Sequence, residues 1–171
     1  MQTVALNKMI DKLGLTNLVP EVETDGIEIN SSEINRPALQ LAGYFEHFAC
    51  DRVQIIGYVE YTYLNSLEPE VKMKNYELFM SSRIPCVIYA SRTEPDEVMI
   101  ELAKKYKKPL LSSERTTSSL MAEIIRWLNV ELAPCISIHG VLVDVYGEGV
   151  LIMGESGIGK SEAALELLKR G

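Results

Sequence analysis

The feature that most constrains the fold is a glycine-rich segment, Gly154-Glu155-Ser156-Gly157-Ile158-Gly159-Lys160-Ser161, which fits the pattern G-x-x-x-x-G-K-[ST] at every fixed position. The apolar residues 150–153 before it are typical of a strand buried on both faces of a parallel sheet. After it, Ala164, Leu165 and Leu168 fall on one side of a predicted helix. A strand, a glycine loop and a helix in this order surround an anion with backbone N–H groups and the positive end of the helix dipole.

We therefore predict that residues 154–161 bind the phosphates of a nucleotide. The Lys160 ammonium group is expected to reach the outer phosphates, and the Ser161 hydroxyl is expected to ligate Mg²⁺. The alternative is a glycine-rich turn that matches by chance, which at average glycine usage happens in roughly one chain in a hundred or fewer. The flanking strand and helix favour the nucleotide-binding interpretation.

Composition excludes several other classes of function. The net charge of -7 argues against a broad surface for nucleic acid or membranes. No apolar stretch approaches the roughly 20 residues that span a bilayer, and no signal peptide is recognisable. Cys50, Cys86 and Cys135 lack metal-binding spacing, so we interpret them as reduced thiols, most simply as small buried hydrophobic residues. We expect a cytoplasmic protein without nucleic-acid or membrane partners.

The first 132 residues predict an α/β domain with a mainly parallel sheet flanked by helices, because short apolar runs alternate with amphipathic segments. Strands are expected at residues 18–19, 27–29, 53–56, 86–89 and 110–111. Helices are expected at residues 4–13, in two pieces broken near Pro69 within residues 58–82, after Asp96, and at residues 117–132. A further helix is predicted to be capped by Asn35, with Pro37 in its first turn and Gly43 at its end.

Ala133 and Pro134 mark a predicted boundary between domains at residues 1–132 and 133–171. Beyond it, residues 135–145 are rich in β-branched side chains and are expected to form a strand that turns at residues 146–149 into the strand before the phosphate loop. One hairpin and one helix cannot bury both faces of a sheet. We therefore expect residues 133–171 to be the opening of a larger domain, in a fragment or in a chain completed by a partner.

The sequence resembles the bacterial HPr kinase/phosphorylase family along essentially its whole length. The matching stretches are Ser31-Ser32-Glu33-Ile34-Asn35-Arg36-Pro37, Gln40-Leu41-Ala42-Gly43-Tyr44, Asp51-Arg52-Val53-Gln54-Ile55, Ile138-His139-Gly140-Val141-Leu142-Val143-Asp144 and the phosphate loop. Many NTPases share the loop alone. Its combination with the segments around Asn35 and His139 is specific.

The resemblance implies an N-terminal α/β domain, followed by the start of a catalytic domain akin to that of phosphoenolpyruvate carboxykinases. It implies phosphorylation of a serine of HPr with ATP or pyrophosphate, phosphate-driven removal of that phosphoryl group, control of carbon catabolite repression, and a homo-hexamer. Residues 154–161 carry over as the ATP site, Lys160 as a catalytic residue and Ser161 as a Mg²⁺ ligand. The family continues with an aspartate pair, a metal-binding glutamate and a signature loop, so we expect this chain alone to be inactive.

His139 has two interpretations. From the residues alone, a histidine on an apolar strand is more often a hydrogen-bonded core residue than a functional one. Ser137 and His139 are predicted, however, to share a strand face beside the phosphate-loop strand, where the imidazole can contact a phosphoryl group or orient a neighbouring acid. His139 also matches the active-site histidine of the family that the chain resembles, whereas His47 is assigned to structure.

Two alternative functions remain open at this stage. The first is a regulatory or interaction module formed by the N-terminal domain, and the second is an unrelated phosphate-loop ATPase or metabolite kinase.

Overall fold

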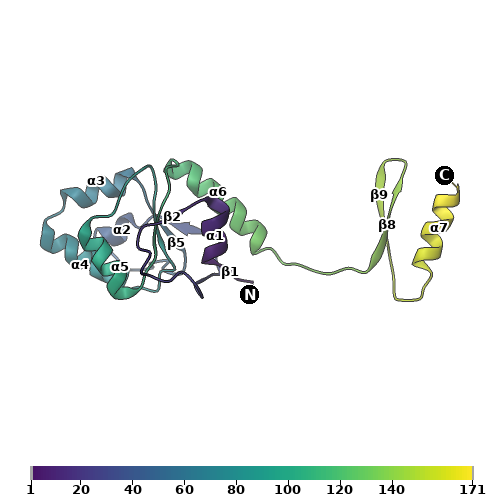
Figure 1. Ribbon diagram of the computed structural model, residues 1–171, viewed down its shortest axis with the longest axis horizontal. Coiled ribbons are helices and arrows are strands. Elements are labelled where there is room, and N and C mark those ends of the chain that lie inside the picture. The colour runs from purple at the N-terminus through teal and green to yellow at the C-terminus, as the bar shows by residue number, and fades with distance from the viewer. Residues whose placement is uncertain (1, 171) are drawn as a thin grey trace. The chain divides into compact units, whose positions relative to one another are not determined.

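The computed structural model describes residues 2–170, which divide into two compact units between Ala133 and Pro134 (Figure 1). Each unit has its own strands and helices. Among the described residues, no helix combines the length and the apolar content needed to cross a bilayer.

A five-stranded sheet with the order β2-β7-β6-β5-β4 forms the centre of the first unit. Four neighbouring strands are parallel, namely β4 (Ile34–Asn35), β5 (Val53–Ile56), β6 (Val87–Tyr89) and β7 (Leu110–Ser112). The edge strand β2 (Thr16–Asn17) is antiparallel to β7, and β1 (Val4–Ala5) pairs with β3 (Glu28–Ile29) in a separate small sheet. The predicted α/β fold with a mainly parallel sheet is confirmed.

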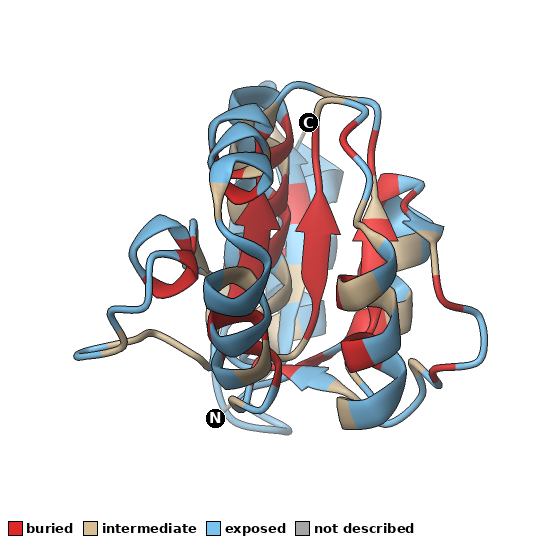
Figure 2. Ribbon diagram, turned by 90° about the vertical axis from the view of Figure 1, so that its left-hand side faces the viewer, coloured by how far each residue is buried: buried red, intermediate tan, exposed pale blue. Residues whose placement is uncertain are grey.

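Helices cover both faces of this sheet, and the buried residues form two clusters on its two sides (Figure 2). Helices α1 (Leu6–Leu13) and α6 (Thr117–Glu131) pack on one side. Helices α2 (Ala38–Leu41), α3 (Tyr58–Ser66), α4 (Pro69–Met80) and α5 (Glu97–Tyr106) pack on the other. Because side chains alternate along a strand, Ile88 enters the first cluster while Val87 and Tyr89 enter the second. Burial on both faces explains why β6 is wholly apolar and why β5 is apolar except for Gln54, whose side chain is hydrogen-bonded to Asn35, Ala49 and Arg52.

Several helices begin or end at the glycine, proline and aspartate residues that the sequence analysis identified. Gly14 ends α1 with φ of 58°, a conformation that glycine adopts without strain. Pro69 is the first residue of α4, and the side chain of Asp96 caps α5 by accepting a hydrogen bond from the Met99 N–H at 2.9 Å. The two-piece helix of residues 58–82 is therefore confirmed.

Two predictions in the first unit are wrong. Asn35 is not a helix cap but the last residue of β4, and its side chain donates to the Gln54 side-chain oxygen at 2.8 Å on the neighbouring strand. The helix that follows begins after Pro37 and has only four residues. The edge strand expected at residues 18–19 lies instead at Thr16–Asn17, where the chain pairs with β7.

The second unit consists of an antiparallel hairpin and one helix. Strands β8 (Gly140–Val145) and β9 (Glu148–Met153) are joined by Tyr146 and Gly147, whose φ values of 54° and 87° suit a tight two-residue turn. Helix α7 (Lys160–Arg170) follows the phosphate loop. The strand was expected to begin at residue 135, but residues 135–139 are irregular.

The strand before the phosphate loop is not buried on both faces in this chain. Val150, Leu151 and Met153 are exposed, because the two-stranded sheet has too few neighbouring elements to cover them. On α7, only Ala164 of the predicted apolar side is buried, while Leu165 and Leu168 are exposed.

Candidate phosphate-binding site

The glycine-rich segment forms a loop between the end of β9 and the start of α7, and its glycines are required for different reasons. Gly157 and Gly159 have φ values of 85° and 95°, which L-amino acids with side chains rarely adopt. At Gly154, an added Cβ would lie only 2.9 Å from Cγ2 of Ile158. A side chain at Gly157 or Gly159 would therefore strain the loop backbone, whereas one at Gly154 would displace the Ile158 side chain.

The loop borders an open cavity of about 620 Å³. The cavity is lined by residues 154–157 and 159–161 together with His139, Gly140 and Glu162, all from the second unit. Of the loop residues predicted to bind phosphate, only Ile158 is not in its wall, and this side chain is exposed. Gly140 and Glu162 were not predicted as site residues, although each is adjacent in sequence to one that was, His139 and Ser161.

Lys160 extends back across the loop. Its Nζ donates to the carbonyl oxygens of Gly154 at 2.8 Å and Glu155 at 2.7 Å, which leaves one of the three ammonium N–H groups for another acceptor. Lys160 is also the first residue of α7, so its charge adds to the positive end of the dipole of an 11-residue helix. The first turn of α7 is formed by the Ala163 N–H, which donates to the Gly159 carbonyl at 2.9 Å.

The charges around the cavity are mixed. Lys160 is the one lysine or arginine among the lining residues, and it is accompanied by the carboxylates of Glu155 and Glu162. These carboxylates oppose a free polyanion and are compatible with a phosphate that carries a divalent cation. Within residues 2–170, no group of three or more His, Cys, Asp or Glu side chains forms a ready-made metal site.

His139 lines the cavity, but not in the predicted way. It immediately precedes Gly140, the first residue of β8, and Ser137 also lies in the irregular segment. The interpretation that the two residues share a strand face is therefore wrong. His139 is nevertheless next to the phosphate loop because residue 140 pairs with Met153, directly before Gly154.

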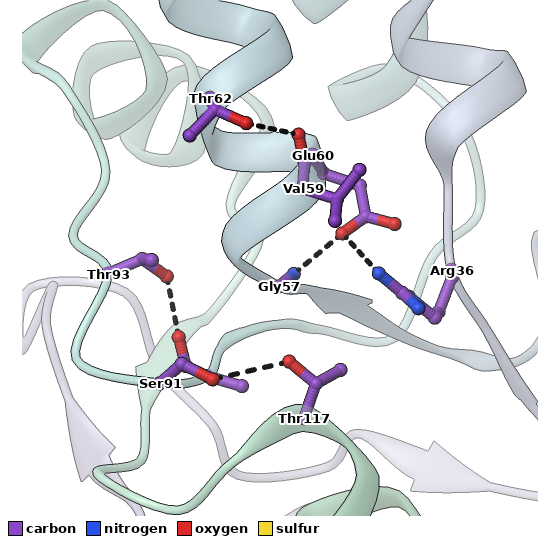
Figure 3. Close-up of polar contacts among 9 residues, drawn as sticks. Arg36, Gly57, Val59, Glu60, Thr62, Ser91, Thr93 and Thr117 are labelled. Atoms are coloured by element: carbon purple, nitrogen blue, oxygen red, sulfur yellow. Dashed lines mark hydrogen bonds and ion pairs between the residues drawn. The ribbon is translucent and has the colours of Figure 1, made fainter.

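The segment around Arg36 has a structural position in the first unit (Figure 3). Oε2 of the buried Glu60 accepts hydrogen bonds from the Arg36 guanidinium at 2.8 Å and from the Gly57 N–H at 3.0 Å. Nearby, the hydroxyls of Ser91 and Thr117 are 3.3 Å apart. These polar groups satisfy one another at the carboxyl ends of the parallel strands, which accounts for them without a ligand.

A strand, a glycine loop with left-handed glycines, and a lysine at the start of a helix define a phosphate-loop unit. Residues 4–128 match the family model described as HPr Serine kinase N terminus, and residues 130–171 match HPr Serine kinase C-terminal domain. The chain belongs to the HPr serine kinase family.

Three curated relatives named HPr kinase/phosphorylase illustrate this similarity. The protein of Lachnoclostridium phytofermentans is 54% identical over 100% of this chain and 55% of its own length. That of Caldicellulosiruptor bescii is 48% identical over 97% and 53%, and that of Caldanaerobacter subterraneus subsp. tengcongensis is 46% identical over 100% and 56%. The chain thus spans about half the length of the curated relatives that it matches.

Proposed function

We propose that this chain is part of a bifunctional protein-serine kinase/phosphorylase. In this proposal the enzyme phosphorylates a serine of HPr with ATP or pyrophosphate, and it removes the phosphoryl group by phosphorolysis in the control of carbon catabolite repression. The observation that carries the proposal is the loop at residues 154–161, with Lys160 at the cavity, in a chain of the HPr serine kinase family. The names of the relatives support the same reaction.

The residues of the loop fit a Mg²⁺-bound polyphosphate. The loop amides and the start of α7 would hold the phosphate oxygens, and Lys160 would exchange its contacts with two carbonyl oxygens for contacts with the outer phosphates. The Ser161 hydroxyl would hold Mg²⁺, which supplies charge neutralisation when bound.

His139 is proposed to contact the transferring phosphoryl group or to orient the acid that acts on it, because it lines the same cavity as Lys160. We expect the carboxylate that serves as base for the kinase and acid for the phosphorylase to lie in the part of the family's length that this chain does not span. The proposed enzyme is cytoplasmic and assembles as a homo-hexamer.

A regulatory or interaction role of the first unit is the second candidate. It is favoured by the two buried clusters of this unit, which are complete without residues from the second unit. Such a role is compatible with the kinase/phosphorylase proposal. Membership of the HPr serine kinase family argues against an unrelated phosphate-loop ATPase.

The decisive experiment uses a chimera in which this chain replaces the matching half of the Lachnoclostridium phytofermentans relative. Lys160→Ala should lower both phosphoryl transfer from ATP to HPr and phosphate-dependent dephosphorylation by roughly 10²-fold or more. Lys169→Ala is the matched control, because Lys169 lies on the same helix and does not line the cavity. Near-normal turnover of either reaction by the Lys160 variant, or transfer to small acceptors but not to HPr, would refute the proposal.

A further inference from the structure

The hydroxyl of Tyr89 is the one buried side-chain polar atom of the described residues that has no hydrogen-bond partner. Tyr89 is the last residue of β6, and its side chain is 1% exposed within the cluster that packs against α4 and α5. Buried hydroxyl groups are almost always paired, since an unpaired one loses its hydration without compensation. A partner for Tyr89 is therefore expected from outside the chain.

Tyr89 lines a cavity of about 230 Å³ in the first unit. Its other walls come from the α3 residues Tyr61 and Asn65, from Tyr76 of α4, and from the segment that holds Glu94 and Asp96 before α5. Because an apolar cavity of about 150 Å³ holds benzene, this one has room for roughly six to nine non-hydrogen atoms.

The walls of this cavity combine carboxylates with aromatic rings, and no lysine, arginine or histidine is among its lining residues. Glu94 is exposed and has no hydrogen-bond or ion-pair partner among residues 2–170, so its carboxylate is available to a cation. Asp96 is already held by the Met99 N–H and by the Tyr76 hydroxyl at 3.3 Å. Carboxylates and the faces of tyrosine rings both attract organic cations.

A lysine of the protein itself makes both kinds of contact, with a carboxylate and with a tyrosine ring, beside the cavity. The Lys72 ammonium group forms an ion pair with Asp96 and lies 5.5 Å from the centre of the Tyr76 ring. Lys72 belongs to the wall of an adjoining cavity of about 530 Å³, which shares Leu64, Asn65 and Asp96 with the first and adds apolar side chains such as Met73 and Val98. A cation in the smaller cavity could therefore extend an apolar tail along α3 and α5.

We propose that the Tyr89 cavity binds a small organic ammonium compound with a short apolar tail. The ammonium group donates to the Tyr89 hydroxyl oxygen and to the Glu94 carboxylate, and the tail lies toward Leu64. Burial raises the pKa of Tyr89, so the hydroxyl stays neutral at physiological pH and can accept this hydrogen bond. The site lies in the first unit and does not depend on the proposed kinase/phosphorylase activity.

Titration of the 171-residue chain with butylammonium, observed by amide chemical shifts, tests the proposal. Butanol and butyrate are matched neutral and anionic probes of the same length. We expect saturable shifts at residues 89–96 with butylammonium, an affinity about 10-fold or more above that for butanol, and no saturation with butyrate. Equal effects of butylammonium and butanol, or no saturation with any probe, would mean that the cavity holds only water, and the proposal would be overturned.

Two variants locate the binding. Tyr89→Phe removes only the hydroxyl and Glu94→Gln removes only the charge, and each should weaken butylammonium binding about fivefold or more. Tyr63→Phe and Glu101→Gln are the controls, since Tyr63 on α3 and Glu101 on α5 have the same side chains and do not line the cavity. Unchanged affinity in either test variant contradicts the proposal. Glu94 is exposed, so its variant remains informative if Tyr89→Phe fails to fold.

Discussion

The guanidinium of Arg36 donates at 2.8 Å to the carboxylate of Glu60, whose side chain is only 3% exposed. The same carboxylate oxygen accepts the Gly57 N–H at the start of α3. The pair therefore links the end of β4 to the beginning of the helix that follows β5. Removing Arg36 would leave a buried negative charge with only the backbone amide as partner.

Arg36→Met should lower the free energy of unfolding of the first unit by about 2–3 kcal/mol, below the range for fully buried pairs because 40% of the Arg36 side chain is exposed. Urea unfolding measures this change. The same substitution in a Glu60→Gln background should cost at least about 1 kcal/mol less, because no buried charge is then left unpaired. As a control, Arg92→Met, which breaks the largely exposed pair with Glu114, should cost roughly 0–1 kcal/mol. Equal costs of the Arg36 substitution in both backgrounds would contradict the assigned role.

Gly159→Ala should weaken binding of Mg-ATP by the chimera about 10-fold or more. The φ of 95° at this position is strained for alanine by about 1–2 kcal/mol, and relief of the strain would reorient the loop amides. Isothermal titration calorimetry gives the affinity. Gly149→Ala is the control, because Gly149 does not have positive φ and an added Cβ there would meet only Leu142 at 4.0 Å. Wild-type affinity in the Gly159 variant would show that the loop conformation does not matter for binding.

Burial raises the pKa of the Cys86 thiol from 9.0 to about 12. Between these values the unfolded chain has released the thiol proton while the folded chain retains it, so the contribution of Cys86 to stability is complete below pH 9 and is lost as the pH rises toward 12. The stability of the wild type should fall more steeply above pH 9 than that of Cys86→Ala, by up to about 1.4 kcal/mol per pH unit. Urea unfolding at pH 8 to 10.5 measures both slopes. Cys135→Ala, at an exposed position, should keep the wild-type slope.

Limited proteolysis should cleave the chain within residues 134–139 and leave a stable fragment that ends near Ala133. Residues 135–139 are irregular and exposed, while the first unit keeps its own buried clusters. Trp127, the single tryptophan, is buried on α6 and reports the unfolding of this unit. Its fluorescence transition should keep the same midpoint after cleavage. A shift to much lower denaturant would mean that the first unit depends on the second.

The sequence was sufficient to predict those strands, helix starts and loops whose conformation is determined by their own residues. Residues 53–56 and 86–89 were recognisable as strands because burial on both faces favours apolar runs, in which Gln54 is the one polar exception. Pro69 begins a helix through its fixed φ, and Asp96 begins one through its capping side chain. The glycine loop was recognisable because phosphate binding constrains residue types at fixed spacing.

The failures concern residues whose conformation is set by distant partners. Asn35 has the side chain of a good helix cap, but its pairing with Gln54, 19 residues away, holds it in a strand. The exposure of Leu151 depends on the number of strands beside β9, and this number cannot be predicted from the residues around Leu151. The bonds of Lys160 to its own loop carbonyls, and the lone hydroxyl of Tyr89, likewise appear only once the chain is folded.

The antiparallel edge of the main sheet joins residue 16 to residue 112, so its two strands come from nearly opposite ends of the first unit. Closing so long a loop costs more chain entropy than joining β5 to β6 through α3 and α4 and β6 to β7 through α5. During synthesis, the parallel strands would therefore assemble first, and β2 would pair with β7 only afterwards. This pairing would be the last and slowest step in the folding of the first unit.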